Sequence, residues 1–189
     1  MRIAVTGGIG SGKSAVCDIL REKGYPVFSC DAITRELQED PGYLREVEAA
    51  FPGTVERGRL DRKKLAAAVF SDPEKLARLN GLAHPRIMET LRLRMEGHPL
   101  SFAEVPLLFE SGHEGDFDAV IVVWRDREER IAAVMGRDGA SREEVTARME
   151  SQADYGRIVR EGRYPVLRNE GDLPALKKSL DALLARILA

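Results

Sequence analysis

Residues 2–14 read RIAVTGGIGSGKS, and this stretch decides the fold. It opens with a short run rich in β-branched side chains, passes through closely spaced glycines and stops on Lys13 and Ser14. Apolar residues then follow at helical spacing, at Val16, Ile19 and Leu20. This succession predicts a strand, a glycine loop and a helix. A second strand is expected at Val27 to Cys30, which completes a βαβ-like opening.

The glycine loop matches the pattern G-x-x-x-x-G-K-[ST] at Gly7, Gly12, Lys13 and Ser14. Its glycines let the backbone curl so that successive N–H groups and a helix N-terminus face phosphates. The lysine reaches the outer phosphates, and the serine hydroxyl is a hard oxygen ligand for Mg²⁺. We therefore expect a nucleoside triphosphate here, with Ser14 as the metal ligand. The expected contacts are Gly8, Ile9, Gly10, Ser11, Gly12, Lys13, Ser14 and Ala15.

The composition limits the class of protein. With 189 residues and 43% hydrophobic side chains, the chain can bury one substantial core but not two large ones. Its 29 Lys and Arg against 31 Asp and Glu give a net charge of −2, which argues against a dedicated binder of nucleic acid or anionic membranes. We expect a monomer or a weak oligomer.

The sequence also predicts a cytoplasmic location. No run approaches the roughly 18 to 20 apolar residues of a membrane span, and the N-terminus lacks the pattern of a signal peptide. The two cysteines, Cys17 and Cys30, are too few for a disulfide scaffold and lack metal-ligand spacing. We therefore interpret both as packing residues in a reducing compartment.

The rest of the chain divides into a helical part and a returning α/β part. Residues 32–100 lack a convincing strand, and helices are expected at Tyr43 to Phe51, Leu60 to Phe70 and Glu74 to Met95. Strands are expected at Phe102 to Val105, Asp118 to Trp124 and Tyr164 to Leu167. A closing amphipathic helix is expected at Leu173 to Ile187. Capping-box spacings, with helices running to about Met135 and Gln152, occur at Asp126 with Glu129 and Ser141 with Glu144.

These elements predict an α/β protein with a three-layer P-loop NTPase fold: a parallel sheet, a helical insertion and a small helical lid. We expect a single domain with its core at about residues 1–31, 100–125 and 160–189. The insertion would cover about residues 32–99, and the lid about residues 126–155.

The loop motif does not say what becomes of the triphosphate, because GTP switches, ATP-driven machines and small-molecule kinases all use it. The chain contains neither the N-K-x-D nor the D-x-x-G signature of GTPases, and motor ATPases are normally larger. The open readings are a kinase for a small acceptor and a nucleotide-dependent switch or binding protein with slow hydrolysis.

Some charged side chains could act on an acceptor. Asp31 follows the second strand at the sheet edge where open α/β folds bind ligands, so it could accept a hydroxyl proton or simply cap a helix. Arg137, Arg142 and Arg148 surround a predicted helix-turn-helix. Their forked donors could reach a phosphate from a mobile lid, or they could be solvated side chains on a helix face.

Two further motifs are ambiguous from the residues alone. His84 lies in LAHPRI, before a proline that should bend or interrupt a helix, and it could contact a ligand or be structural. The segment VPLLFE, which contains Leu108 and ends at Glu110, follows an expected strand. Its carboxylate could hold the water shell of Mg²⁺ or a substrate group, or it could face solvent.

The motifs in their order are similar to those of the dephospho-CoA kinase family. They are TGGIGSGKS, the aspartate in CDAITR, GRLDRKKLAAAVF, AHPRI, VPLLFE, GRD, ARMESQ and NEG. Together they run from residue 3 to residue 171, about nine tenths of the chain. Each motif after the first is weak alone, but their order and spacing together are specific.

The resemblance implies a reaction and roles for single residues. ATP with Mg²⁺ would phosphorylate the ribose 3′-hydroxyl of dephospho-CoA, and Asp31 would be the base. The resemblance places Arg62 and His84 on the coenzyme-binding insertion and makes Arg137 and Arg148 lid and transition-state arginines. Asn169, in the late N-x-G, would lie near the adenine of ATP, and Leu108 and Glu110 would contact substrate. Kinases for another small hydroxyl acceptor stay the alternative within enzymes.

The sequence departs from the family pattern in three places. Arg163 and Tyr164 stand where the family usually has Ala-Asp, which affects the expected adenine contacts. Ala15 replaces a common threonine, although Ser14 keeps the hydroxyl that faces the metal. Ser29-Cys30 replaces more usual acidic and small residues before Asp31, which changes the surroundings of that carboxylate.

Overall fold

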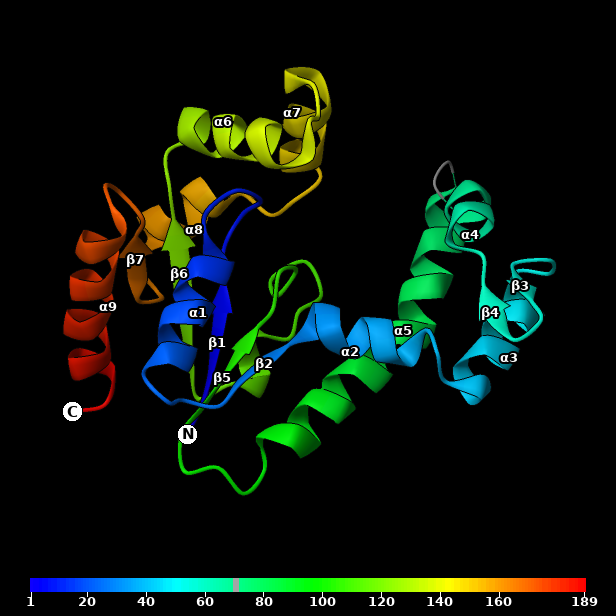
Figure 1. Cartoon of the computed structure of the whole chain (residues 1–189), viewed down its shortest axis with the longest axis horizontal. Helices are drawn as coiled ribbons and strands as arrows, with labels where there is room; N and C mark the ends of the chain where they lie inside the picture. Colours follow the sequence, from blue (N-terminus) through cyan, green and yellow to red (C-terminus); the bar gives the residue numbers. More distant parts are fainter. Residues whose placement is uncertain (70–71) are drawn as a thin grey trace. The chain divides into compact units, whose positions relative to one another are not determined.

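The computed structural model describes residues 1–69 and 72–189, and the chain divides into two compact units (Figure 1). The first unit consists of Met1–Phe28 and Gly97–Ala189, and the second of Ser29–Glu96. The assignment of a core, a coenzyme-binding insertion and a lid to particular ranges stays a prediction. Phe70, the expected last residue of one helix, lies outside the described residues.

A five-stranded sheet organises the first unit. Its strands are β1 (Arg2–Thr6), β2 (Val27–Ser29), β5 (Ser101–Glu104), β6 (Ala119–Trp124) and β7 (Val166–Arg168). The order is β2-β5-β1-β6-β7, so the strand that leads into the glycine loop lies at the centre. β1 pairs in parallel with β5 and β6, and β6 with β7. The predicted parallel sheet is confirmed, with ends that differ by one or two residues.

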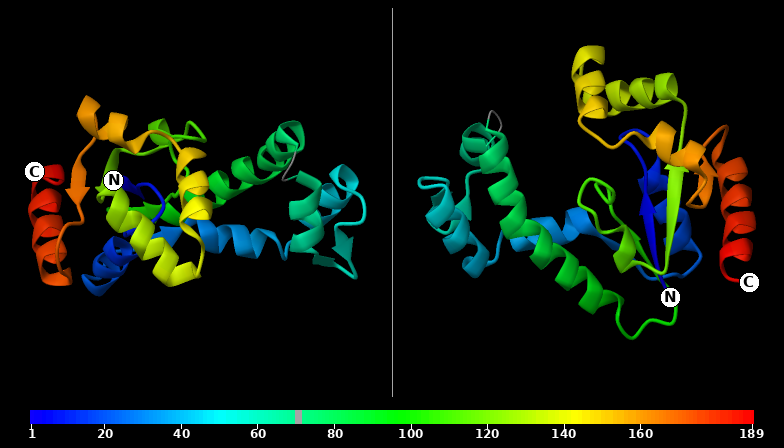
Figure 2. Two further views of the ribbon diagram at one scale, coloured as in Figure 1. Left: turned by 90° about the horizontal axis from the view of Figure 1, so that it is seen from above. Right: turned by 180° about the vertical axis from the view of Figure 1, so that it is seen from behind.

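Two helices cover one face of this sheet. They are α1 (Lys13–Glu22) and α9 (Leu173–Ile187), which contact each other, and α9 runs along β7 (Figure 2). Buried leucines of α9 and the apolar side of α1 pack on Ile3, Val5 and Phe102 of the strands. Cys17 belongs to this core and is fully buried, as its expected packing role requires.

The segment between β6 and β7 forms three helices. They are α6 (Arg127–Asp138), α7 (Arg142–Glu150) and α8 (Tyr155–Glu161); a short 3-10 turn, η1 (Glu114–Asp116), precedes β6. Ser141 and Glu144 form the predicted capping box of α7. The box predicted at Asp126 and Glu129 is wrong, because Asp126 accepts from the N–H of Glu128 while Glu129 bonds to Arg125 instead. Helix α8 was not predicted.

The second unit contains helices and one small hairpin. Its elements are α2 (Cys30–Leu37), α3 (Pro41–Ala50), β3 (Val55–Glu56), β4 (Arg59–Leu60), α4 (Arg62–Val69) and α5 (Pro73–Met95). Tyr43, Val47 and Phe51 of α3 and its end pack with Leu65 and Val69 of α4 in a core of their own. The expectation of no strand in residues 32–100 is therefore wrong at the hairpin. Helix α5 also continues through Pro85, which does not interrupt it.

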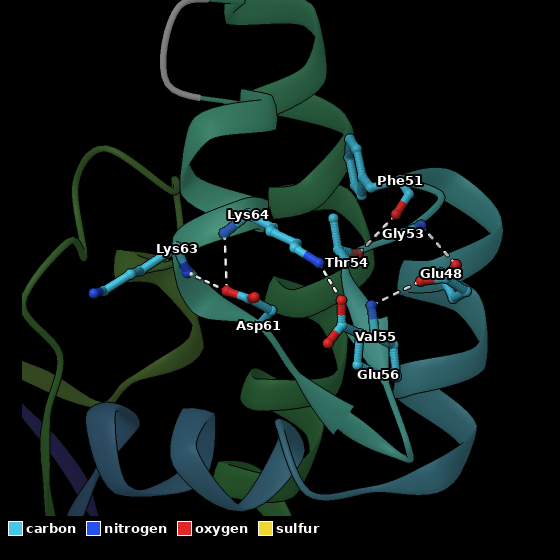
Figure 3. Close-up of polar contacts among 9 residues, drawn as sticks. All are labelled: Glu48, Phe51, Gly53, Thr54, Val55, Glu56, Asp61, Lys63 and Lys64. Atoms are coloured by element: carbon cyan, nitrogen blue, oxygen red, sulfur yellow. Dashed lines mark hydrogen bonds and ion pairs between the residues drawn. The ribbon is translucent and has the colours of Figure 1, made fainter.

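Polar contacts fix the hairpin between α3 and α4 (Figure 3). The carboxylate of Glu48 accepts from the backbone N–H groups of Gly53 at 2.7 Å and Val55 at 2.8 Å, and these bonds lower its pKa. Asp61 accepts from the N–H groups of Lys63 and Lys64, which caps the start of α4. The aspartate of the motif GRLDRKKL therefore has a structural role in this unit, because it caps the start of a helix.

None of the helices within the described residues combines the length and the apolar character that are needed to cross a lipid bilayer.

Candidate active site

The glycine loop connects β1 to α1 at the carboxyl end of the central strand, where parallel α/β sheets bind ligands. Gly12 begins α1 with a φ of 92°, in the left-handed region. A Cβ atom at this position would lie 2.2 Å from Nδ2 of Asn169. The glycine is therefore required both by backbone conformation and by close contact.

The start of α1 differs from that of the other helices in the described part of the chain. Each of α2 to α9 begins beside a serine or aspartate whose oxygen accepts a backbone N–H. α1 has no side-chain cap and no acidic residue in its first turn. Its N–H groups and the positive end of its dipole are thus available to an external anion, so this cradle fits a phosphate.

Lys13 and Ser14 are brought to this cradle as the motif predicts. Nζ of Lys13 lies over the loop and donates to the carbonyl oxygens of Gly7 at 2.7 Å and Gly8 at 3.2 Å. Oγ of Ser14 donates to Oε1 of Glu104 at 3.0 Å. Two hard oxygen groups therefore lie together at the loop, a donor set that suits Mg²⁺.

Glu104 was missed by the sequence analysis. It ends β5 and stands in register with Val5, one residue before the end of β1, so pairing of the two strands brings it beside the loop. The available signal was its place at the end of an apolar strand, directly before VPLLFE. The described residues contain no group of three or more His, Cys, Asp or Glu side chains that could hold a metal ion. A cation here would therefore need phosphate or water oxygens besides Ser14 and Glu104.

Asn169 lies against the loop. Its Nδ2 donates to the carbonyl oxygen of Ser11 at 2.9 Å, and its own N–H donates to the carbonyl of Trp124 at 2.8 Å. Asn169 therefore binds the glycine loop through its side chain. The adenine contact stays a prediction. Arg163, six residues before Asn169, lies over the ring of its neighbour Tyr164, with 5.3 Å from Cζ to the ring centroid.

The predicted lid arginines fall into two groups. Arg137 and Arg148 come together at Asp138, at 2.6 Å and 3.3 Å, and Arg142 bonds instead to Glu128 on α6. The hydrogen bonds from Arg137 and the nearby charge of Arg148 lower the pKa of Asp138. Both arginines are exposed, and Asp138 occupies the donors that a phosphate would use. A fourth arginine, Arg130, is buried against the loop and was not singled out from sequence.

The VPLLFE segment contacts the chain around the start of α8. Leu108 is fully buried, and its contact with a substrate stays a prediction. Glu110 is exposed, and its Oε1 accepts from the N–H of Ala153 at 2.8 Å. The hydroxyl of Tyr155 bonds with Thr6 at 3.2 Å and with the carbonyl of Pro106 at 3.4 Å. Burial raises the pKa of Tyr155 to about 12, so it stays neutral.

Three predicted site residues belong to the second unit. Asp31 is exposed in the first turn of α2, whose N-cap is Ser29, so the alternative that Asp31 caps this helix is wrong. Arg62 is exposed at the first position of α4. His84 is half-buried within α5, one residue before Pro85. Their roles toward a substrate stay predictions.

Comparison with known proteins gives this site a family. A family model described as dephospho-CoA kinase matches residues 1–174. The chain belongs to the dephospho-CoA kinase family. The dephospho-CoA kinase of Thermus thermophilus is 44% identical over 189 residues, which cover 98% of this chain and 91% of that protein. The dephospho-CoA kinase of Deinococcus radiodurans is 43% identical over 195 residues, and the match covers 98% of this chain and 92% of that protein.

A solved structure agrees with this result. The dephospho-CoA kinase of Campylobacter jejuni is 26% identical, with a TM-score of 0.70 over 98% of this chain and 96% of that one. The family resemblance of the motifs and the P-loop kinase fold are therefore confirmed. As a member of the dephospho-CoA kinase family, the chain is a kinase with ATP as its co-substrate. These matches favour the kinase reading over the switch.

Proposed function

We propose that the chain transfers the γ-phosphoryl group of ATP to the ribose 3′-hydroxyl of dephospho-CoA, giving CoA and ADP, in the last step of coenzyme A synthesis. The observation that carries the proposal is the phosphate cradle of α1, in a chain that shares its family and nearly its whole length with named dephospho-CoA kinases. The cradle supports binding of the anionic donor, and the family relation supports the acceptor.

The donor would be held by the backbone of residues 8–15 and by Lys13. The side chain of Lys13 already lies over the loop, so it needs only to exchange carbonyl oxygens for phosphate oxygens. Ser14 and Glu104 would hold Mg²⁺, directly or through its water shell. When bound, Mg²⁺ would offset the negative charge of the phosphates.

The transfer step forms a bond between the 3′-oxygen and the γ-phosphorus, while the bond from that phosphorus to the β,γ-bridging oxygen breaks. The bridging oxygen and its electron pair leave with ADP. The hydroxyl proton passes to a base, for which we propose the exposed carboxylate of Asp31. Arg137 and Arg148 would exchange Asp138 for the oxygens of the moving phosphoryl group and stabilise their charge.

The other predicted residues would bind the two substrates. Arg62, His84, Leu108 and Glu110 would contact dephospho-CoA. Asn169 would lie near the adenine of ATP while its amide holds Ser11.

Product analysis tests this function. The protein is incubated with ATP, Mg²⁺ and dephospho-CoA, and the products are identified by mass. CoA and ADP should form in equal amounts, and removing either substrate should stop both. Release of ADP without an acceptor would favour a switch. Failure to convert dephospho-CoA, with transfer to another small alcohol, would favour a different kinase.

Asp31→Asn tests the base. This variant should bind ATP normally and lose about 10²–10⁴-fold in turnover, because an amide cannot accept the proton. The matched control is Glu39→Gln, which removes an exposed carboxylate near the end of α2. If Asp31→Asn turned over like Glu39→Gln, another group would be the base.

A further inference from the structure

Ile9 lies in the P-loop and is bound by two residues of the predicted lid, one on α6 and one just after α7. Its carbonyl oxygen accepts from Nε of Arg130 on α6 at 2.8 Å. Its N–H donates to Oε1 of Gln152, just after α7, at 2.7 Å. Its half-buried side chain packs on the apolar cluster of α6 and α7, formed by Ile131, Val134 and Val145. Both backbone groups and the side chain of one loop residue are thus fixed by the lid.

Arg130 is unusual among the arginines of the described chain because only 7% of its surface is exposed. A Cβ atom at Gly8 would lie 2.3 Å from its Nη2, so the guanidinium lies directly on the loop backbone. Within residues 1–69 and 72–189, no carboxylate forms an ion pair with it, and burial lowers its pKa. Burying a charge without a counter-ion costs stability, so stability of the fold does not account for an arginine here.

The orientation of the Ile9 peptide groups matters for an anion site. The P-loop binds phosphate only while its successive N–H groups converge, and a rotated peptide would turn a carbonyl oxygen toward the anion. The donor on the carbonyl oxygen fixes the peptide group that follows Ile9. The acceptor on the N–H fixes the peptide group that precedes it, so neither group can rotate freely.

We propose that Arg130 and Gln152 are positioning residues that hold the two backbone groups of Ile9, set the curl of the P-loop for ATP and join the base of the lid to it. The inference rests on the proposed function only in that the loop binds ATP.

The chain offers variants that separate the possible roles. In Arg130→Gln, the amide nitrogen stands as many bonds from Cα as Nε does, so the donor to Ile9 is kept while the charge is lost. Arg130→Met and Gln152→Met keep the size of the side chain but lose the donor and the acceptor. The control is Arg127→Met, which removes the same charge from an exposed site on the same helix.

The first measurement is calorimetric affinity for the non-hydrolysable β,γ-imido analogue of ATP with Mg²⁺. Arg130→Met and Gln152→Met should each lose about tenfold, the effect of one well-placed hydrogen bond. Arg130→Gln should stay within about threefold of the native chain, and Arg127→Met should not change. The double methionine variant should lose less than the product of the two single losses, because the two bonds hold adjoining peptide groups that share Ile9.

The second measurement needs no nucleotide. Amide hydrogen exchange by NMR should show faster exchange at Ile9 and Gly10 in both methionine variants and normal exchange in Arg130→Gln. The melting temperature of Arg130→Met should be unchanged or higher, because a buried unpaired charge is removed. A purely structural role would lower it.

Several results would overturn the proposal. If Arg130→Gln bound as weakly as Arg130→Met, the charge would act on the phosphates directly. If the affinity losses of the two single methionine variants multiplied in the double variant, the two contacts would act independently. Unchanged loop exchange would show that Ile9 is not held by these side chains. If the native chain bound no ATP, the proposed function would fail, while the exchange measurement would still decide on the positioning role.

Discussion

Replacement of Gly12 by alanine should lower the free energy of unfolding by about 2–4 kcal/mol. The φ of 92° would cost an alanine about 1–2 kcal/mol. Its Cβ would also lie 2.2 Å from Nδ2 of Asn169, so that side chain must move and give up its 2.9 Å bond to Ser11. Loss of this bond, with the carbonyl of buried Ser11 left unpaired, adds about 1–2 kcal/mol.

Two controls separate these contributions in urea unfolding followed by circular dichroism. Gly24 has a φ of 84°, and a Cβ there would meet no atom within 4 Å, so Gly24→Ala should cost only the conformational 1–2 kcal/mol or so. Asn169→Ala removes the group with which the new methyl collides. Combined with Gly12→Ala, it should cost about 1 kcal/mol less than the sum of the two single variants.

The reasoning would be refuted if Gly12→Ala and Gly24→Ala were equally destabilising. Strict additivity with Asn169→Ala would refute it as well, because the two residues would then not share a contact. Gly12→Ala should also weaken ATP binding, since the loop cannot keep its shape around a displaced Asn169.

Three further predictions concern the site and its surroundings. Lys13→Ala should lower kcat by about 10²–10³-fold in a chain that still folds, because it removes a contact to the moving phosphoryl group; native turnover would contradict this role. Glu104→Gln should raise the Mg²⁺ concentration for half-maximal activity by about ten- to a hundredfold, whereas an unchanged requirement would leave Glu104 only a partner of Ser14. Burial raises the pKa of the Cys17 thiol to about 12, whereas an unfolded thiol ionises near 8.5, so its contribution to stability is complete below about pH 8.5 and is lost as pH rises. Urea unfolding between about pH 9 and about pH 10 should therefore show the native chain losing about 1 kcal/mol more than Cys17→Val; parallel losses would contradict this.

The fold could be predicted because its determinants are local. The glycine loop, the apolar strand at Ala119–Trp124 and the leucine pattern of α9 each carry their structure within a few residues. The hairpin of β3 and β4 could not, because its strands have two residues each. Its turn places Arg57 at a φ of 51°, a position where asparagine or glycine would have given a clear signal.

The site was only partly predictable for a different reason. Glu104 depends on the register between β5 and β1, which no local pattern states. Arg130 lies in a helix with many charged residues, and most of them are exposed. A usable signal was its spacing of four residues from Val134, which places both on the buried side of α6. Gln152 stands in the motif ARMESQ, but its bond to Ile9 depends on how the chain after α7 packs on the loop.

Because α1 begins without a side-chain acceptor, a bound triphosphate completes this helix, and it does so only in the folded chain. A ligand of the folded state alone adds about 2.7 kcal/mol of stability when present at a hundredfold excess over its Kd. A cell short of ATP would thus hold a larger unfolded share of this chain, open to proteases. The abundance of the kinase would then follow the energy supply of the cell without a dedicated regulator.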